Sequence, residues 1–480
     1  MKILLNYIDG TLKPPVSGEY LDNINPARGE VYAKIPDSDA RDVADAVDAA
    51  RRAFPAWAGL PAEKRSDFLL SLADLVDSHV DELALAESID TGKPLALAKH
   101  MDIARASVNL RFYATAILHF ASSAHPMEGL ATNYTVHRPV GVAGCISPWN
   151  LPLYLFTWKI APALAAGNCV VAKPSELAPM TAFLFSELCI QAGMPAGVLN
   201  IVHGLGAKAG QAIVEHPEVP LISFTGGSST GKRIAVTAAP MLKRLSLELG
   251  GKNPTIVFSD CDFDEAVKNT VRSSFLNQGE ICLCGSRIFV ERKIYGKFKR
   301  AFLQEVAQLS IGDPLHPDTF IGAVISEAHA QKVMDYIQLA KEEGGNILIG
   351  GKRHLMEKEH AGGFFILPTV IEGLSYDCRC NQEEIFGPVV SIMPFDTMEE
   401  VLHDANSTPY GLAANIWTLN VQKAHQVAQQ LDAGIVWVNC WLLRDLRTPF
   451  GGVKQSGIGR EGGFEALQFF TESKNICIKH

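Results

Sequence analysis

The chain has 480 residues, of which 47% are hydrophobic and 20% charged, and its formal net charge is −9. These proportions are typical of a soluble globular protein and exclude bulk disorder. The mild negative charge gives no electrostatic basis for binding DNA or an anionic membrane. At roughly 100–200 residues per domain, the length predicts two or three domains with a large core.

The ten cysteines are too few for a disulfide scaffold in a chain of this length. The close pairs Cys282/Cys284 and Cys378/Cys380 lack zinc-site spacing and histidine-rich partner segments, so no metal is expected. The N-terminal apolar run is too short for a signal peptide, and no segment approaches about 18 consecutive apolar residues. We therefore expect a cytoplasmic protein in a reducing compartment, without nucleic-acid or membrane partners.

Apolar strands and amphipathic helices alternate along most of the chain, which predicts an α/β fold. Apolar residues recur at helical spacing over residues 39–54 and predict a helix that stops before Pro55. Strands at intervals of roughly 25–30 residues between 140 and 250 predict a parallel, doubly wound sheet. We expect these strands at 140–146, 169–172, 200–202 and 221–224, and a helix at 178–192.

A second α/β series is expected between residues 254 and 440. Its strands are predicted at 255–258, 287–290, 346–349, 389–394 and 434–438. The tail at 475–479 alternates apolar and polar residues, which indicates a strand at a sheet edge. Its pairing partner is left open, another subunit being one candidate.

A predicted strand runs into a glycine-rich turn and then a helix over residues 221–231. This geometry directs backbone N–H groups and a helix N-terminus at an anion such as pyrophosphate. The segment is not the usual G-x-G-x-x-G fingerprint, so a turn without a ligand is equally open. A second turn, at 203–206, is more simply explained as a plain loop.

Lys173, Pro174, Ser175 and Glu176 follow a predicted buried strand. A solvated loop is the simpler interpretation. In the functional alternative, Lys173 and Glu176 flank an adenosine ribose. A carboxylate there would accept hydrogen bonds from the ribose hydroxyls and repel a 2′-phosphate, which favours NAD over NADP.

Cys282 is the strongest local feature, because it stands between Asn-Gln-Gly and Gly-Ser-Arg segments that indicate a presented thiol. Most cysteines are nevertheless buried and inert. Glu248 lies among leucines before two glycines, where burial would raise its pKa and suit it to general-base catalysis; a surface carboxylate is the alternative. The Asn150 amide, after another strand, is either an oxyanion donor or a turn residue.

Taken together and in order, these segments resemble the motif series of the aldehyde dehydrogenase superfamily over almost the whole chain. The matching segments are 148–150, 173–176, 224–231, 248–252, 279–282, 384–388 and 449–452. The resemblance implies two Rossmann-like α/β domains: an NAD-binding domain at 1–120 and 140–250, and a catalytic domain at 251–450. It also implies a β extension at 121–139 and 465–480 that joins subunits into homodimers or homotetramers.

The resemblance further implies residue roles. Cys282 would be the nucleophile, Asn150 the oxyanion donor together with the Cys282 backbone N–H, and Glu248 the base that activates water for hydrolysis. The implied NAD contacts are Trp149, Lys173, Ser175, Glu176, Gly206, Gly226, Gly231, Leu249, Glu384 and Phe386. Gly227 stands where the family usually has serine, and Ser228 is the candidate replacement for that hydroxyl.

Arg105 and Arg444 fall, by family register, where members acting on apolar aldehydes carry methionine or aromatic residues facing the substrate tunnel. A guanidinium there would bind a carboxylate. The alternative is that both are ordinary surface arginines. The same two interpretations apply to Arg447. Further substrate contacts are expected at Leu151, Trp158 and Phe450.

The sequences around Asn150, Cys282 and Arg444 resemble the branch of the family that oxidises 2-aminomuconate and 2-hydroxymuconate 6-semialdehydes. The expected function is therefore NAD-dependent oxidation of a carboxylated, unsaturated semialdehyde to the dicarboxylate, through a thiohemiacetal and a thioester on Cys282. The choice between a 2-amino and a 2-hydroxy substrate stays open. The alternatives are an aldehyde dehydrogenase for betaine aldehyde or aliphatic aldehydes, and a non-enzymatic structural protein.

Overall fold

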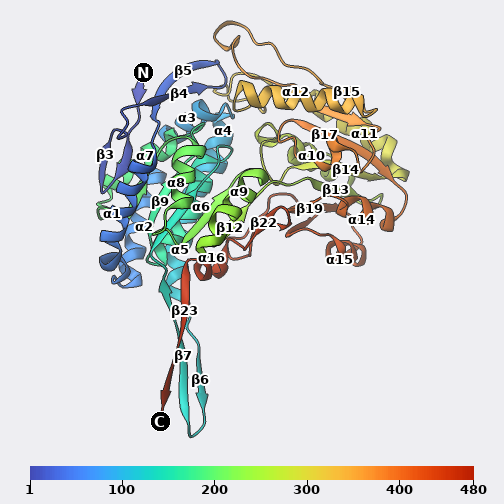
Figure 1. Cartoon of the computed structure of the whole chain (residues 1–480). Helices are drawn as coiled ribbons and strands as arrows, with labels where there is room; N and C mark the ends of the chain where they lie inside the picture. Colours follow the sequence, from blue (N-terminus) through green and yellow to red (C-terminus); the bar gives the residue numbers. More distant parts are fainter.

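An eight-stranded sheet, in the order β22-β12-β11-β8-β9-β10-β2-β3, forms the first of two α/β bodies in the computed structural model, which describes residues 1–480 (Figure 1). Its five central strands run parallel: β8 Val142–Ile146, β9 Cys169–Lys173, β10 Leu199–Ile201, β11 Leu221–Thr225 and β12 Arg244–Glu248. The chain winds outward from β8 to β10, then returns to the other side of β8 for β11 and β12. The predicted doubly wound sheet is thus confirmed.

The remaining strands of this sheet are antiparallel, namely β2 Asn6–Ile8, β3 Thr11–Lys13 and β22 Gly457–Ile458. A small sheet of β1 Lys2–Ile3, β4 Tyr20–Asn25 and β5 Glu30–Pro36 lies beside them. The helices of this body are α1 Ala40–Ala58, α2 Ala62–Ser78, α3 Val80–Thr91, α4 Leu95–Leu97, α5 Ala104–Ala116, α6 Pro152–Ala165, α7 Met180–Gln191, α8 Gln211–Glu215 and α9 Ser228–Ala238. No helix in the chain combines the length and apolar character that crossing a membrane requires.

The predicted end of the first helix before Pro55 is wrong, because α1 continues to Ala58. Proline removes one N–H and displaces the carbonyl of residue i−4, which here belongs to the exposed Arg51 and is open to water. The last turn is held from the other side by Trp57. This side chain is buried, and its Nε1 donates to the Leu164 carbonyl oxygen at 3.2 Å.

The second body contains a seven-stranded sheet in the order β15-β16-β17-β14-β13-β19-β20, parallel except for β15. Its strands are β13 Asn253–Val257, β14 Gly285–Glu291, β15 Asn346–Ile349, β16 Thr369–Glu372, β17 Val389–Phe395, β19 Ala413–Trp417 and β20 Ile435–Val438. Its helices are α10 Phe263–Phe275, α11 Arg292–Ala307, α12 Glu327–Glu342, α13 Arg379–Gln382, α14 Met398–Asn406 and α15 Val421–Gln430. The predicted second α/β series is confirmed, and β16 and β19 are additional strands that the sequence did not indicate.

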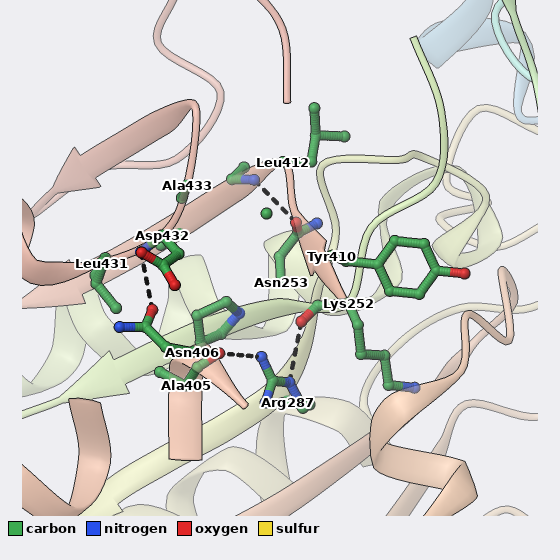
Figure 2. Close-up of a pocket in the computed structure, with 14 residues that line it drawn as sticks. Lys252, Asn253, Arg287, Ala405, Asn406, Tyr410, Leu412, Leu431, Asp432 and Ala433 are labelled. Carbon is green, nitrogen blue, oxygen red and sulfur yellow. Dashed lines mark hydrogen bonds between the residues drawn. The ribbon is translucent and has the colours of Figure 1, made fainter. Parts of the chain in front are cut away.

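Arg287 in β14 joins three segments of this body. Its guanidinium donates to the carbonyl oxygens of Lys252 at 3.0 Å and Ala405 at 2.7 Å (Figure 2). It also donates to the Asp404 carbonyl oxygen at 2.8 Å. The cavity beside it holds about 10 Å³, which is room for one water molecule at most, so it is a packing gap rather than a ligand site. Arg287 therefore fixes the backbone that follows β12, the strand on which Glu248 stands.

A three-stranded antiparallel arm projects away from both bodies (Figure 1). It consists of β6 Ala124–Met127, β7 Ala131–Pro139 and β23 Thr471–Lys479, which follows α16 Gly463–Phe469. The predicted tail strand thus pairs with β7 of its own chain. The predicted domain limits stay a prediction, although the arm falls within the ranges given for the extension.

Candidate active site

The first sheet reverses its strand order between β8 and β11, and the carboxyl ends of these two strands face the same crevice. Ligands of doubly wound sheets bind at such a switch point. The segment carrying Trp149 and Asn150 follows β8, and the turn with Gly226 and Gly227 follows β11. The sheet topology therefore brings together Asn150 and Gly226, which lie far apart in the sequence.

Two cavities meet here. The larger has a volume of about 450 Å³ and a mostly apolar wall, and the smaller has about 240 Å³. Cys282 and Thr225 line both. A thiol at this junction can react with a molecule in one cavity while a second molecule occupies the other.

Cys282 owes its position to unusual backbone just before it. Asn277, Gln278 and Gly279 have φ angles of 52°, 56° and 73°, all in the left-handed region. A Cβ on Gly279 would lie 2.2 Å from the Gly387 carbonyl oxygen, so only glycine fits. Asn277 donates to the carbonyls of Asn150 and Glu280, and Gln278 donates to Ala323. These amides stabilise a conformation that is costly for residues with side chains.

Asn253 holds the same loop from the other side. Its Nδ2 donates to the backbone oxygens of Cys282 at 2.7 Å and Cys284 at 2.9 Å, and its Oδ1 accepts from the Ala413 N–H at 3.0 Å. Figure 2 shows Asn253 next to Lys252 and close to Leu412, which directly precedes β19. The Cys282 loop is thus fixed to the sheet of the second body.

Asn150 is fixed by a buried charged cluster. Its backbone oxygen accepts from Lys93 Nζ at 2.8 Å, and Lys93 also contacts Asp102 and lies 3.6 Å from Glu87. The Asn150 side-chain Nδ2 donates to the Glu280 carbonyl at 2.8 Å. This bond uses one of its two amide hydrogens and leaves the other for a ligand.

Glu248 ends β12 and lines the larger cavity. Both carboxyl oxygens are buried without a hydrogen-bond partner. Burial, and then the nearby Glu461, raise the pKa of Glu248 well above its ordinary value. This environment matches the one predicted from the leucines around it.

Glu461 also lines the larger cavity, and no sequence motif pointed to it. Its Oε1 accepts from Lys159 Nζ at 2.8 Å and from Ser223 Oγ at 3.1 Å. A single acid within the glycine-rich segment 457–463 was the only signal available.

Burial is also the main cause that raises the pKa of the Cys282 thiol, and the carboxylates of Glu384 and Glu248 raise it further. The thiol is therefore protonated at neutral pH. Attack on a carbonyl requires a base to remove its proton.

Arg105 on α5 and Arg444 both line the larger cavity. Arg105 Nε donates to Asn109 Oδ1 at 3.2 Å, and Arg444 Nη1 donates to the Tyr154 hydroxyl at 3.3 Å. The Nη2 atom of each guanidinium is buried and has no partner. Neither arginine forms an ion pair with a protein carboxylate, so both can bind an anion. The exposed Arg447, in contrast, pairs with Asp445 at 2.6 Å.

Aromatic rings frame these two guanidiniums. Arg444 lies 4.0 Å from the Phe450 ring and 5.2 Å from the Trp158 ring, and Arg105 lies 5.9 Å from Trp158. Leu151 and Phe450 line the cavity as expected, whereas Trp158 lies next to both guanidiniums but does not line the cavity. Tyr154, a cavity residue that the sequence did not suggest, lies 5.4 Å from Arg105.

The smaller cavity collects half of the expected cofactor residues. Trp149, Gly226, Leu249, Glu384 and Phe386 line it. Glu384 Oε1 accepts from the Gly251 N–H at 2.9 Å. His329 and Lys332 of α12 also line the cavity and were missed, because an amphipathic helix in a distant part of the chain gives no local sign of what it faces.

The other expected cofactor residues lie along the carboxyl edge of the same sheet. Lys173, at the end of β9, donates to Glu176 Oε2 at 2.9 Å, and the Gly206 N–H donates to Glu176 Oε1 at 3.5 Å. Ser175 Oγ accepts from the Leu177 N–H. These residues do not line the smaller cavity, so the two groups mark two ends of an extended site.

The N-terminus of α9 follows the Gly226–Gly227 turn at the smaller cavity and is open. Gly227 at its N-cap provides no side-chain cap, so the first N–H groups of the helix are free for an anion. A Cβ on Gly231 would lie 2.4 Å from Leu249, so glycine permits the close packing of the helix on the segment after β12. The residues present therefore fit a dinucleotide. The side chains show no grouping of three or more His, Cys, Asp or Glu as metal ligands.

Comparison with known proteins agrees with this geometry. Residues 14–476 match the aldehyde dehydrogenase family. The 2-aminomuconic semialdehyde dehydrogenase of Mus musculus is 52% identical over 481 residues, covering 100% of this chain and 98% of that protein. The 2-hydroxymuconic semialdehyde dehydrogenase of a Pseudomonas species is 47% identical over 485 residues, covering 100% of both. The NAD+ complex of a Bacillus cereus aldehyde dehydrogenase superposes with a TM-score of 0.97 at 40% identity, covering 99% of this chain and 96% of that chain. The chain belongs to the aldehyde dehydrogenase family.

Proposed function

We propose that this chain is an NAD-dependent dehydrogenase that oxidises 2-aminomuconate or 2-hydroxymuconate 6-semialdehyde to the dicarboxylate. The observation that carries the proposal is the pair of unpaired guanidiniums, Arg105 and Arg444, in the cavity that contains Cys282. Relatives at 52% and 47% identity bear the names of enzymes for these two semialdehydes.

The chemistry of the cavity favours a substrate with a carboxylate at one end and an aldehyde at the other. A buried N–H without a partner costs about 1–3 kcal/mol, more when charged, and a carboxylate would satisfy both Nη2 atoms. An aliphatic aldehyde would leave them unpaired, and the trimethylammonium group of betaine aldehyde would be repelled. The apolar wall suits the unsaturated carbon chain between the two ends.

The reaction follows from the positions of three side chains. Once deprotonated, the Cys282 sulfur adds to the aldehyde carbon, and the free hydrogen of the Asn150 amide binds the resulting oxyanion. When bound, NAD supplies the hydride acceptor that turns this adduct into a thioester. Glu248 then takes a proton from water, the water oxygen adds to the thioester carbon, and the acid leaves with release of the thiolate.

Since this chemistry needs a reduced thiol and all ten cysteines are free, we place the protein in the cytoplasm.

NAD is the proposed cofactor rather than NADP, because of Glu176. Its carboxylate is held by Lys173 at the carboxyl end of β9, where the adenosine ribose binds in doubly wound folds. Ribose hydroxyls can donate to this carboxylate, whereas a 2′-phosphate would meet a like charge.

Replacing Arg105 or Arg444 with Met should impair the carboxylated substrate selectively. We expect each variant to lose about 2–5 kcal/mol of transition-state binding for 2-hydroxymuconate 6-semialdehyde, because its carboxylate loses a charged partner. Initial rates of NADH formation measure kcat/KM, with hexa-2,4-dienal as the uncharged comparison. Arg447→Met is the matched control, since Arg447 is exposed and paired with Asp445. Full activity of both variants on the carboxylated substrate would refute the substrate assignment.

Glu248→Gln should block hydrolysis but leave acylation possible. We expect a burst of up to one NADH per active site, followed by turnover reduced by at least about 100-fold. In the unmodified enzyme, a base with a raised pKa is protonated in acid, so hydrolysis should rise with pH through a range well above the ordinary carboxyl pKa. Stopped-flow absorbance across pH measures both effects. Steady turnover by the variant at the parent rate would exclude Glu248 as the base.

Glu176→Gln should relax the cofactor preference. Without the carboxylate, the repulsion of the 2′-phosphate disappears, and we expect the ratio of kcat/KM for NADP to that for NAD to rise by about tenfold. Initial rates with each cofactor give this ratio. An unchanged ratio would mean that another group excludes NADP.

We also propose that the arm of β6, β7 and β23 joins copies of this chain. All of β6 and most of β23 are exposed, and a small sheet without a packed apolar face is poorly stable alone. The molecular mass of the intact protein from sedimentation should be two or four times the 52.0 kDa mass of one chain. Ile478→Lys, on the exposed side of β23, should shift it towards smaller species, whereas Leu355→Lys, an exposed apolar position off the arm, should not. Sedimentation velocity of all three proteins tests this, and a monomeric parent would contradict it.

A further inference from the structure

We propose that Arg272 determines specificity at the entrance of the larger cavity, where it captures the substrate carboxylate before Arg105 and Arg444 bind it. This inference rests on the proposed function, because it takes the substrate to be an anion. Arg272 lines the same cavity as the two deeper arginines. No motif drew attention to it, since it occupies the last turn of α10 without a local pattern.

Exposure separates Arg272 from the deeper pair. Arg272 is exposed, as are His100 and Val108 on the same cavity wall, whereas Arg105 and Arg444 are only partly exposed. The exposed wall residues mark the side that opens to solvent. A substrate coming from solution therefore passes Arg272 before it reaches the other two guanidiniums.

A ring contact holds the Arg272 guanidinium in place, and no protein carboxylate neutralises its charge. It lies 5.5 Å from the centre of the Trp441 ring, within cation–π distance. Trp441 is buried, and its Nε1 donates to the Leu283 carbonyl oxygen at 3.0 Å, one residue after Cys282. Arg272 forms no ion pair, so its positive charge remains available to an anion at the cavity wall.

A local cation is needed because the protein as a whole repels anions. Its net charge is −9, whereas the charged lining of the cavity has three arginines against Glu248 and Glu461. Glu461 is already paired with the buried Lys159. An excess of positive charge between low-dielectric walls concentrates an anion inside the cavity. Arg272 extends this field to the solvent side. It lies over the ring of Trp441, which stands three residues before Arg444 in the sequence.

Salt dependence separates this role from a structural one. Arg272→Gln should lower kcat/KM for 2-hydroxymuconate 6-semialdehyde by about 3–10-fold at an ionic strength of about 20 mM, and by less than about twofold at about 500 mM, where salt screens the charge. The kcat for this substrate, and kcat/KM for hexa-2,4-dienal, should change by less than about twofold. Arg272→Lys should recover most of the loss, since it restores the charge.

Arg300→Gln is the matched control. Arg300 is exposed on α11, lines neither cavity and carries the same charge change, so its kcat/KM should match the parent at both salt concentrations. Three results for Arg272→Gln would overturn the inference and leave the proposed function intact. They are an equal loss of kcat/KM with both aldehydes, a loss of kcat/KM that salt does not reduce, and no loss of kcat/KM at all. A parent enzyme without preference for the carboxylated aldehyde would overturn both.

Discussion

The backbone at Asn277, Gln278 and Gly279 takes three successive left-handed conformations, and the position of Cys282 follows from them. Two of these residues have side chains, so the conformation is costly and must be stabilised from outside. The stabilising bonds come from distant segments: the loop of Asn150 after β8, and Ala323 in the second body. The thiol is therefore placed at the junction of the two cavities by contacts that form only when both bodies have folded together.

The same site leaves charges of both signs without full partners. Glu248 has two buried carboxyl oxygens without a hydrogen bond, and Arg105 and Arg444 each have an unpaired Nη2. A protein selected for stability alone would pair or remove such groups. Here each unpaired group faces the larger cavity, and each has a proposed partner in the reaction: water for the carboxylate, and the substrate carboxylate for the guanidiniums.

Local patterns in the sequence predicted those parts of the fold that depend on neighbours in the chain. The parallel strands from β8 to β11 and the helix N-terminus after the glycine-rich turn follow from apolar runs and glycines at short range, whereas β12 was not among the predicted strands. The helix end at Pro55 was wrong because Trp57 packs against Leu164, which lies 107 residues away. Arg272, Glu461 and His329 face the cavities only through the packing of distant segments, and the register of Arg105 and Arg444 came from family resemblance rather than from any pattern around them.

One stretch of chain connects the entrance of the larger cavity to its nucleophile. Arg272 lies in the last turn of α10, and the left-handed residues and then Cys282 follow that helix. The Trp441 indole contacts Arg272 and donates to the Leu283 carbonyl. Trp441 and Arg444 belong to one loop. Contacts through Trp441 therefore connect Arg272 at the entrance with Arg444 deeper in the cavity and with the Cys282 loop. The separation between thiol and guanidinium is then set by packed structure rather than by a mobile loop. A cavity built in this way selects a substrate by the distance between its aldehyde and its carboxylate, in addition to their charges, because binding at both ends requires that distance to match.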